Sequence, residues 1–146
     1  MKLNDQTDYA LRVLIYLGTH SGRRPSTSEI AEAFGISRHH LSKVVTRLAE
    51  LGYTRTQRGR GGGLVLGREP EDINVGTVVD EIESHFDLVE CFREEDNACP
   101  IAGVCALTPM LRDAELAFHD TLARYTLADV LRGRRRALLR KRLGGS

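Results

Sequence analysis

The 146-residue sequence has no long hydrophobic run. Its longest apolar stretches, such as residues 14–17, are far shorter than the roughly 20 residues that span a bilayer. The first residues also lack the apolar core of a secretory signal peptide. These absences argue against a membrane partner and predict a cytoplasmic protein. Hydrophobic residues still make up 41% of the chain, which is enough to build a globular core.

Cysteine is scarce, and all three cysteines lie between Cys91 and Cys105. A reducing cytoplasm disfavours a static disulfide, so an odd number of spaced thiols indicates metal ligation or redox chemistry. An enzyme with a cysteine nucleophile would need a positioned histidine base. No pattern in the sequence pairs His85 or His119 with a thiol, and we expect that the protein is not an enzyme.

Excess charge of either sign is almost absent overall, because the formal net charge is only +1. The charges are nevertheless segregated along the chain. Residues 1–70 carry eleven Lys and Arg against six Asp and Glu, residues 71–131 carry three against fourteen, and residues 132–146 carry seven against none. A basic first half suggests a polyanionic partner.

The first half has the pattern of a helix-turn-helix. Apolar residues at spacings of three and four predict a core helix over residues 5–20. Ser26 and Glu29 form a capping box for a short second helix, which Gly35 ends, and Ser37 caps a third helix with one apolar and one basic face. Two helices joined by a four-residue turn are the helix-turn-helix arrangement.

A glycine-rich hairpin is predicted after the third helix, because residues 53–57 and 63–67 favour strands and residues 58–62 are "RGRGG". The glycine run lacks the Gly-Lys-Ser/Thr ending of a phosphate-binding loop and does not lead into a helix. We therefore predict the wing of a winged helix that binds double-stranded DNA. The candidate DNA-binding residues are Ser28, Ser37, Arg38, His39, His40, Ser42, Lys43, Arg47, Arg58, Arg60 and Gly61, with Arg55 beside them. The alternative is that their charges are merely solvated.

The second half is predicted to hold a cysteine loop between two helices. Thr108 and Pro109 suit the start of a long helix, whose apolar stripe runs from Leu111 to Tyr125. Such a helix either closes its own core or pairs with a copy of itself. The basic tail, residues 132–146, shows no core pattern and is expected to be disordered in part or wholly.

The gaps between the cysteines are wide, with seven residues before Cys99 and five after it. Zinc sites usually place cysteines two to four residues apart, so the wider gaps favour an iron–sulfur cluster, with a structural zinc as the alternative. Three thiolates leave one ligand to be found. The candidates are His85, Glu90, Glu94, Glu95, Asp96 or a residue from elsewhere in the fold, and reasoning from the residues does not choose among them.

Four segments together resemble a known family: "TDYALR", "RGRGGGLVLG", "VGTVVDEIE" and the spaced cysteines. The combination is similar to the bacterial winged-helix transcription regulators typified by IscR and NsrR, over residues 1–130. The resemblance implies a mainly α fold with a small β-hairpin. It divides the chain into a winged helix-turn-helix domain (1–70), a cluster-binding loop with a long dimerisation helix (71–131) and the basic tail (132–146).

The resemblance also implies a fourth ligand and a signal. The iron–sulfur biogenesis branch carries a histidine three residues after the last cysteine, where this chain has Thr108. In the nitric-oxide-sensing branch the fourth ligand is an aspartate on the first helix of the partner subunit, which matches Asp8. The resemblance therefore implies a homodimeric repressor of a pseudo-palindromic operator. Its cluster, [4Fe-4S] or alternatively [2Fe-2S], would be held by Cys91, Cys99, Cys105 and Asp8, and nitric oxide would release the DNA. The alternatives are an iron–sulfur or redox sensor of the same family with another signal, and a zinc-stabilised DNA-binding protein.

Overall fold

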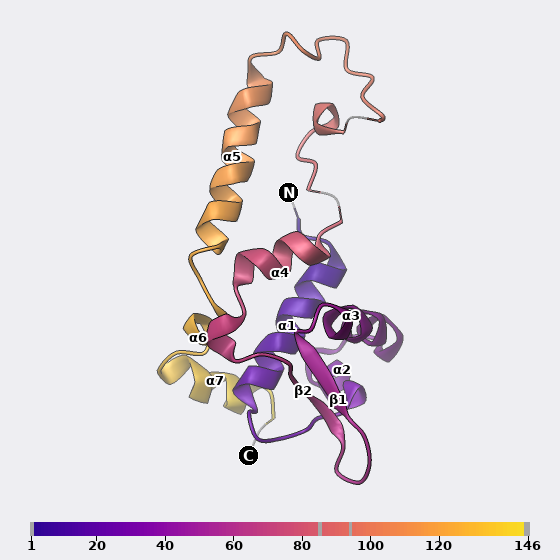
Figure 1. Ribbon diagram of the computed structural model, residues 1–146, viewed down its shortest axis with the longest axis vertical. Coiled ribbons are helices and arrows are strands. Elements are labelled where there is room, and N and C mark those ends of the chain that lie inside the picture. Colours follow the sequence, from indigo (N-terminus) through magenta and orange to yellow (C-terminus); the bar gives the residue numbers. More distant parts are fainter. Residues whose placement is uncertain (1, 85, 94, 145–146) are drawn as a thin grey trace.

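Three helices make up the first 50 residues: α1 (Asp5–Thr19), α2 (Thr27–Phe34) and α3 (Arg38–Glu50). In the computed structural model, which describes residues 2–84, 86–93 and 95–144, Ser26 and Glu29 form the predicted reciprocal capping box of α2. Gly35 then adopts a φ of 63°, which favours glycine, and the chain turns into α3. The predicted helix-turn-helix is confirmed (Figure 1).

The wing is an antiparallel pair of strands, β1 (Thr54–Gln57) and β2 (Gly63–Leu66). Its register pairs Thr54 with Leu66 and Gln57 with Gly63, so residues 58–62 form the tip. The backbone N–H of Leu64 donates to the carbonyl of Pro25 at 2.8 Å, which joins the wing to the loop before α2. The hairpin projects from the lower end of the molecule in Figure 1.

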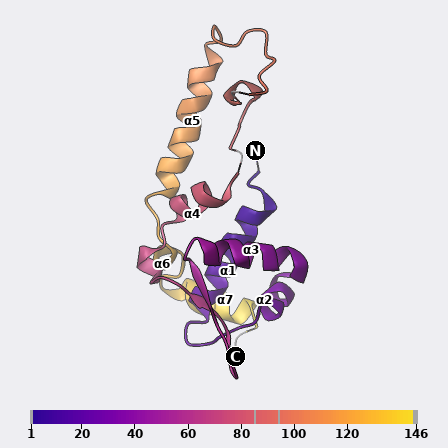
Figure 2. The same cartoon turned by 45° about the vertical axis from the view of Figure 1, so that its right-hand side comes forward.

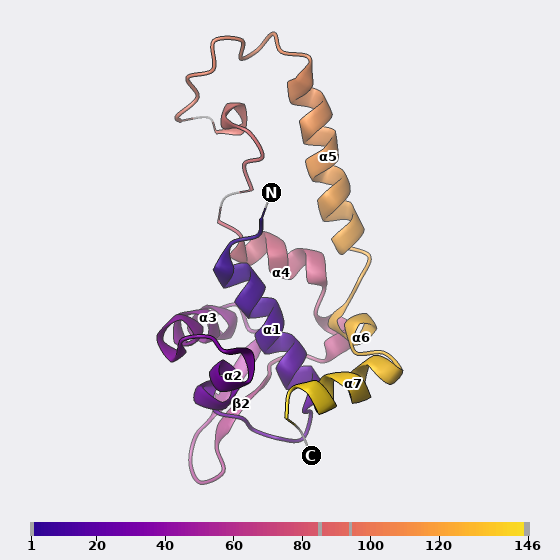
Figure 3. The ribbon, with the colours of Figure 1, turned by 180° about the vertical axis from the view of Figure 1, so that it is seen from behind.

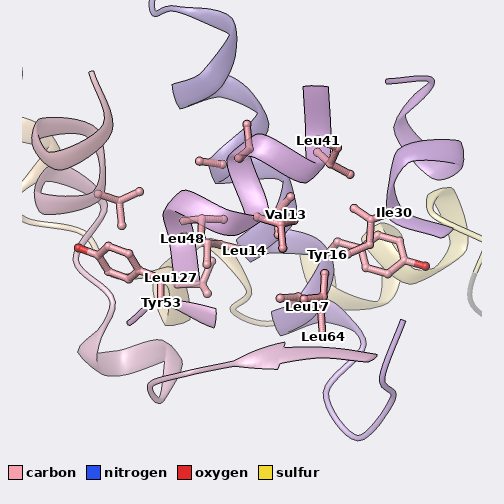
Figure 4. Close-up of a cluster of buried hydrophobic side chains, with 14 of the residues drawn as sticks. Val13, Leu14, Tyr16, Leu17, Ile30, Leu41, Leu48, Tyr53, Leu64 and Leu127 are labelled. Atoms are coloured by element: carbon pink, nitrogen blue, oxygen red, sulfur yellow. The ribbon is translucent and has the colours of Figure 1, made fainter. Parts of the chain in front are cut away.

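One hydrophobic core joins the two halves of the chain. Leu14 of α1, Leu41 and Leu48 of α3, and Leu64 of the wing are all buried in it (Figure 4). The same cluster includes Ile73, Val78 and Leu127 from beyond residue 70. The winged helix is therefore completed by apolar side chains from the second half.

The second half consists of short helices and one long one. They are η1 (Pro70–Asp72), α4 (Val75–Ile82), η2 (Glu90–Phe92), α5 (Leu107–Leu122), α6 (Leu127–Val130) and α7 (Arg134–Arg142). The start of α4 packs closely on the end of α5, because a Cβ on Gly76 would lie 2.7 Å from the backbone nitrogen of Ala123. After α5, an isolated antiparallel β-bridge pairs Thr126 with Asn74, and the chain then packs against the core again.

The structure corrects two expectations for the second half. The long helix begins at Leu107 rather than after a Thr108 cap, and Ala106 at its N-cap provides no side-chain hydrogen bond. The basic tail is not disordered over residues 134–142, which form α7, and Leu139 and Leu143 pack against the core. In the part of the chain that the structure describes, no helix is long and apolar enough to cross a membrane.

Candidate DNA-binding surface and cysteine loop

The eleven candidate DNA-binding residues lie on two elements that neighbour each other along the chain. Eight of them belong to the helix-turn-helix and three to the wing tip, and most are exposed. Ser37 caps α3 by accepting a hydrogen bond from the backbone of His40. Arg47, at the other end of α3, is partly engaged by Glu50 and by the carbonyl of Glu81, both at 3.4 Å. The first turns of α3 therefore hold the side chains that are most available to a ligand.

The wing tip presents two arginines beside glycines. Arg58 and Arg60 are exposed and flank Gly59, whose φ is 97°. Arg55 of β1 is exposed beside them. A charged hairpin tip of this kind can reach a DNA groove next to the one that α3 enters.

The cysteine loop lies at the end of the molecule opposite the wing (Figures 1 and 3). It connects α4 to α5, and Cys91 lies in η2 while Cys105 lies just before α5. All three cysteines are free and partly exposed. Few contacts hold the loop: the Arg112 guanidinium stacks over the Phe92 ring at 4.5 Å, and Glu90 accepts a hydrogen bond from Ala98.

Two of the three thiols lie near the start of α5. The Cys91 Sγ is 3.6 Å from the Thr108 hydroxyl. Backbone N–H groups of Leu107 and Thr108, and the Thr108 hydroxyl, lower the pKa of the Cys105 thiol. These donors favour the thiolate, which is the form that binds metal. Ala106 has no side chain that could cap the helix and compete for these first amides.

The donor set fits an iron–sulfur cluster, although the thiols are not gathered into one cage. Among residues 2–84, 86–93 and 95–144, no three His, Cys, Asp or Glu side chains lie close enough to hold one metal ion. Three unpaired, partly exposed thiols on one loop, one with a lowered pKa, supply the soft sulfur ligands that such a cluster needs. The described residues therefore bring three thiols to one loop without gathering them around one point.

Asp8 is on the surface of α1, where its side chain is 43% exposed. Arg12 holds it with two hydrogen bonds, from Nε at 3.1 Å and from Nη2 at 2.7 Å. Of the loop donors, Glu90 bonds to the Ala98 backbone, whereas Glu95 and Asp96 are exposed. His85 and Glu94 lie outside the described residues. His119 pairs with Asp80 and stands against the Phe86 ring, which places it with an acid rather than with a thiol.

Two glutamates that the sequence patterns did not single out tie the end of α4 to the DNA-binding half. Glu83 accepts hydrogen bonds from the backbone and side chain of Asn4 and from the Thr7 hydroxyl, at 2.8 to 3.0 Å. Glu81 accepts from the Tyr53 hydroxyl, and its carbonyl accepts from Arg47. The segment that leads into the cysteine loop is thus bonded to α1, to α3 and to the residue before the wing.

Because of the hydrogen bond between Tyr53 and Glu81, the free energy of unfolding should depend on pH in the alkaline range. Burial, together with this bond, raises the pKa of Tyr53 from its ordinary value of 10.0 to about 12. The folded state holds the proton more tightly than the unfolded chain, so this contribution is complete below pH 10 and is lost as the pH rises toward 12. We expect Tyr53→Phe to cost about 1–2 kcal/mol at about pH 8.

Urea unfolding of both proteins between about pH 8 and about pH 11.5 measures this difference. The gap between the wild type and Tyr53→Phe should narrow above about pH 10. A gap that stays constant over the whole range would show that the Tyr53 proton is not linked to folding.

The fold and the exposed basic surface define a winged-helix DNA-binding regulator. Residues 3–133 match the Rrf2 family, described as "Iron-dependent Transcriptional regulator". The chain belongs to this family and is a transcription regulator rather than an enzyme. The resemblance found in the sequence motifs is thereby confirmed.

Curated relatives cover most of the chain. It is 48% identical over 135 residues to the HTH-type transcriptional regulator NsrR of Bacillus subtilis, with 92% of each chain covered. It is 41% identical over 133 residues to the HTH-type transcriptional repressor NsrR of Streptomyces coelicolor, covering 90% of this chain and 88% of that one.

Solved structures agree with the fold. IscR of T. potens superposes with a TM-score of 0.72 at 26% identity, covering 90% of this chain and 86% of that one. The global cysteine regulator CymR of B. subtilis gives a TM-score of 0.65 at 29% identity, covering 89% and 95%.

Proposed function

We propose that the chain is a homodimeric transcriptional repressor that senses nitric oxide through an iron–sulfur cluster held by its cysteine loop. The observation that carries the proposal is the loop itself: three free thiols between α4 and the start of α5, on a segment whose first residues bond to α1, to α3 and to Tyr53 just before the wing. The name NsrR, shared by relatives at 40–48% identity, supports the nitric-oxide-sensing branch. We place the repressor in the cytoplasm, with its DNA.

The basic surface is assigned to double-stranded DNA. The N-terminal part of α3, with Arg38, His39 and His40, enters the major groove, and Ser42, Lys43 and Arg47 bond to base edges or phosphates. Ser28 and Ser37 contact the backbone. Arg58, Arg60 and Gly61 carry the wing into the flanking minor groove. Two such units related by a two-fold axis bind a pseudo-palindromic operator, in which the half-sites lie about one helical turn apart.

The long helix α5 is assigned to the dimer. None of its residues is buried within the protomer, and Met110 and Leu116 are 64% and 61% exposed. Leu111, Phe118 and Leu122 of the predicted stripe are only half-buried. A sixteen-residue helix with so much uncovered apolar surface is stabilised by packing against a second copy.

The cluster is assigned to Cys91, Cys99 and Cys105 of one subunit and Asp8 of the other, as [4Fe-4S] in preference to [2Fe-2S]. When bound, it supplies iron that reacts with nitric oxide. A carboxylate binds iron less firmly than a thiolate. The iron that Asp8 would hold is therefore the one most open to attack by a small molecule. Asp8 must leave Arg12 to reach the loop. Without the cluster, Asp8 of one subunit and Cys91, Cys99 and Cys105 of the other would no longer be linked. A movement of the loop would reach α4, and the hydrogen bonds of Glu81 and Glu83 would transmit it from α4 to α1 and α3.

A nitric oxide titration of anaerobically purified protein tests the proposal. Absorbance and binding to operator DNA are followed in the same samples. The brown colour is expected to bleach in step with a loss of DNA affinity. A colourless protein that holds one zinc per chain and still binds DNA in nitric oxide would contradict the sensor but not the DNA-binding surface.

Asp8→Ala is expected to leave the dimer intact and to shorten the lifetime of the cluster about tenfold or more. Iron content and absorbance are followed over time under nitrogen, with gel filtration to show the dimer. Asp5→Ala is the matched control, because it removes a carboxylate one turn away that pairs with the exposed Lys2. Equal lifetimes in both variants would remove Asp8 from the ligand set.

Arg58→Ala is expected to weaken binding to the operator about tenfold and binding to random duplexes much less, because a groove contact carries sequence information. Fluorescence anisotropy on both duplexes measures the two affinities. Arg124→Ala, at the base of α5, removes the same charge at a distance and serves as the control. An equal loss on both duplexes would mean that Arg58 contacts only phosphate.

A further inference from the structure

The basic helix α7 lies beyond the residues that match the Rrf2 family description. The Rrf2 match ends at residue 133, and α7 begins at Arg134. Residues 132–146 contain seven Arg and Lys and no acidic residue. The Rrf2 match itself therefore assigns no role to α7.

The helix is fixed to the winged-helix half by a small number of its own side chains. Leu139 and Leu143 pack against the hydrophobic core. The Arg140 Nε donates to the carbonyl of Thr19 at 3.1 Å, and the Arg136 guanidinium bonds to the Ser21 hydroxyl. Two of the cations and the apolar face thus hold α7 against the end of α1 (Figure 2).

The remaining cations of α7 are exposed. They are Arg134, Arg135, Lys141 and Arg142. Within residues 2–84, 86–93 and 95–144, none of these four forms an ion pair. Their positive charge is left uncompensated on an ordered surface.

This surface lies at the wing end of the molecule. Ser21, which holds Arg136, lines a hollow of about 420 Å³ together with Arg23 and with Arg55 of the wing. The loop of residues 20–25 therefore connects α7 to the hairpin. Figures 1 and 3 show α7 and the wing at the same end, opposite the cysteine loop.

We propose that α7 is an accessory contact for the phosphate backbone of duplex DNA beyond the wing. The charge is complementary to phosphate, and α7 and the wing are both held to the same end of the protein. A membrane surface fits less well, because α7 turns Leu139 and Leu143 into the core and leaves mainly charge outside. The proposal rests on DNA binding by α3 and the wing and adds a sequence-independent part to it.

The test replaces the four exposed cations together, as R134Q/R135Q/K141Q/R142Q in the full chain. Affinity is measured for a duplex limited to the operator, for one with about 15 flanking base pairs on each side, and for a random duplex of the longer length. We expect about a tenfold loss on both long duplexes and little change on the short one. The plot of log affinity against log salt has a negative slope. It should become shallower by about 0.9 for each phosphate that the variant no longer neutralises.

The variant R134K/R135K/R142K keeps the charge and should retain the affinity and the salt slope, since lysine binds phosphate as a point charge. Circular dichroism confirms that α7 remains folded in both variants. Unchanged affinity and slope in the glutamine variant would overturn the accessory contact alone. Binding of vesicles of phosphatidylserine and phosphatidylcholine, abolished in that variant while DNA binding is kept, would overturn it too and assign α7 to membranes. A wild type that binds no duplex would overturn the proposed function as well.

Discussion

Replacing Cys105 by serine is expected to give a folded, colourless protein whose affinity for operator DNA is already low and does not fall further in nitric oxide. Serine is close in size to cysteine, and Cys105 is not part of the hydrophobic core, so stability should change little. The hydroxyl does not ionise near neutral pH and is a poor ligand for iron. The N–H groups of Leu107 and Thr108, which favour a thiolate at this position, then have no thiolate to stabilise. The expected iron content after anaerobic reconstitution is near zero.

Thr108→Val is the matched control for this variant. Valine has nearly the shape of threonine and removes the hydroxyl beside Cys91 and Cys105, while all three thiols and the backbone N–H donors of Leu107 and Thr108 stay in place. Iron content and absorbance should remain close to the wild type, and gel filtration should show dimers for both variants. A Cys105→Ser protein that keeps its full iron content would transfer the ligand role to another side chain.

Leu41→Ala is expected to destabilise the fold by about 2–5 kcal/mol, since it removes most of a completely buried side chain and leaves a cavity. Leu41 lies on the inner face of α3, so the loss acts on the helix that presents the DNA-binding residues. Small domains are stable by only about 5–15 kcal/mol, and part of the protein would unfold at physiological temperature. Urea unfolding at one fixed protein concentration measures the change.

Leu138→Ala makes the same chemical change at a leucine that is 62% exposed. Its effect on the free energy of unfolding should lie within about 0.5 kcal/mol. A Leu41→Ala protein as stable as Leu138→Ala would mean that α3 does not depend on the core for its position.

The elements of the winged helix could be predicted because their causes are local. Ser26 with Glu29, and Ser37 before an apolar face, set the helix starts within a few residues of sequence. The order of the tail could not be predicted in the same way, although Leu139 and Leu143 are four residues apart and lie on one face of α7. Arginines on every side conceal this short pattern. The partners of Arg136 and Arg140 are 115 and 121 residues away in sequence, so no local pattern shows them.

The cysteine loop shows what sequence spacing leaves open. Wide gaps and the identity of the residues indicate the kind of ligand, but few contacts fix the loop within one protomer, and the position of each thiol depends on what it binds. Glu81 and Glu83 show another limit of sequence reasoning, which is that contacts between residues far apart in the chain leave no local pattern. Their importance comes from Tyr53 and Asn4, which are 28 and 79 residues away in the chain, and from nothing in their own surroundings in sequence.

The long helix α5 packs against α4 near its C-terminal end, whereas its N-terminal end carries the cysteine loop. Its base is held where Gly76 meets Ala123 and where Phe118 stacks on Phe86. The arm from Leu107 to Ala117 extends roughly 16 Å beyond that fulcrum, at about 1.5 Å per residue. A shift of about 3 Å at the cysteine end then turns the base by roughly ten degrees. A displacement of the cysteine end would therefore be transmitted along α5 to its contact with α4 at Gly76.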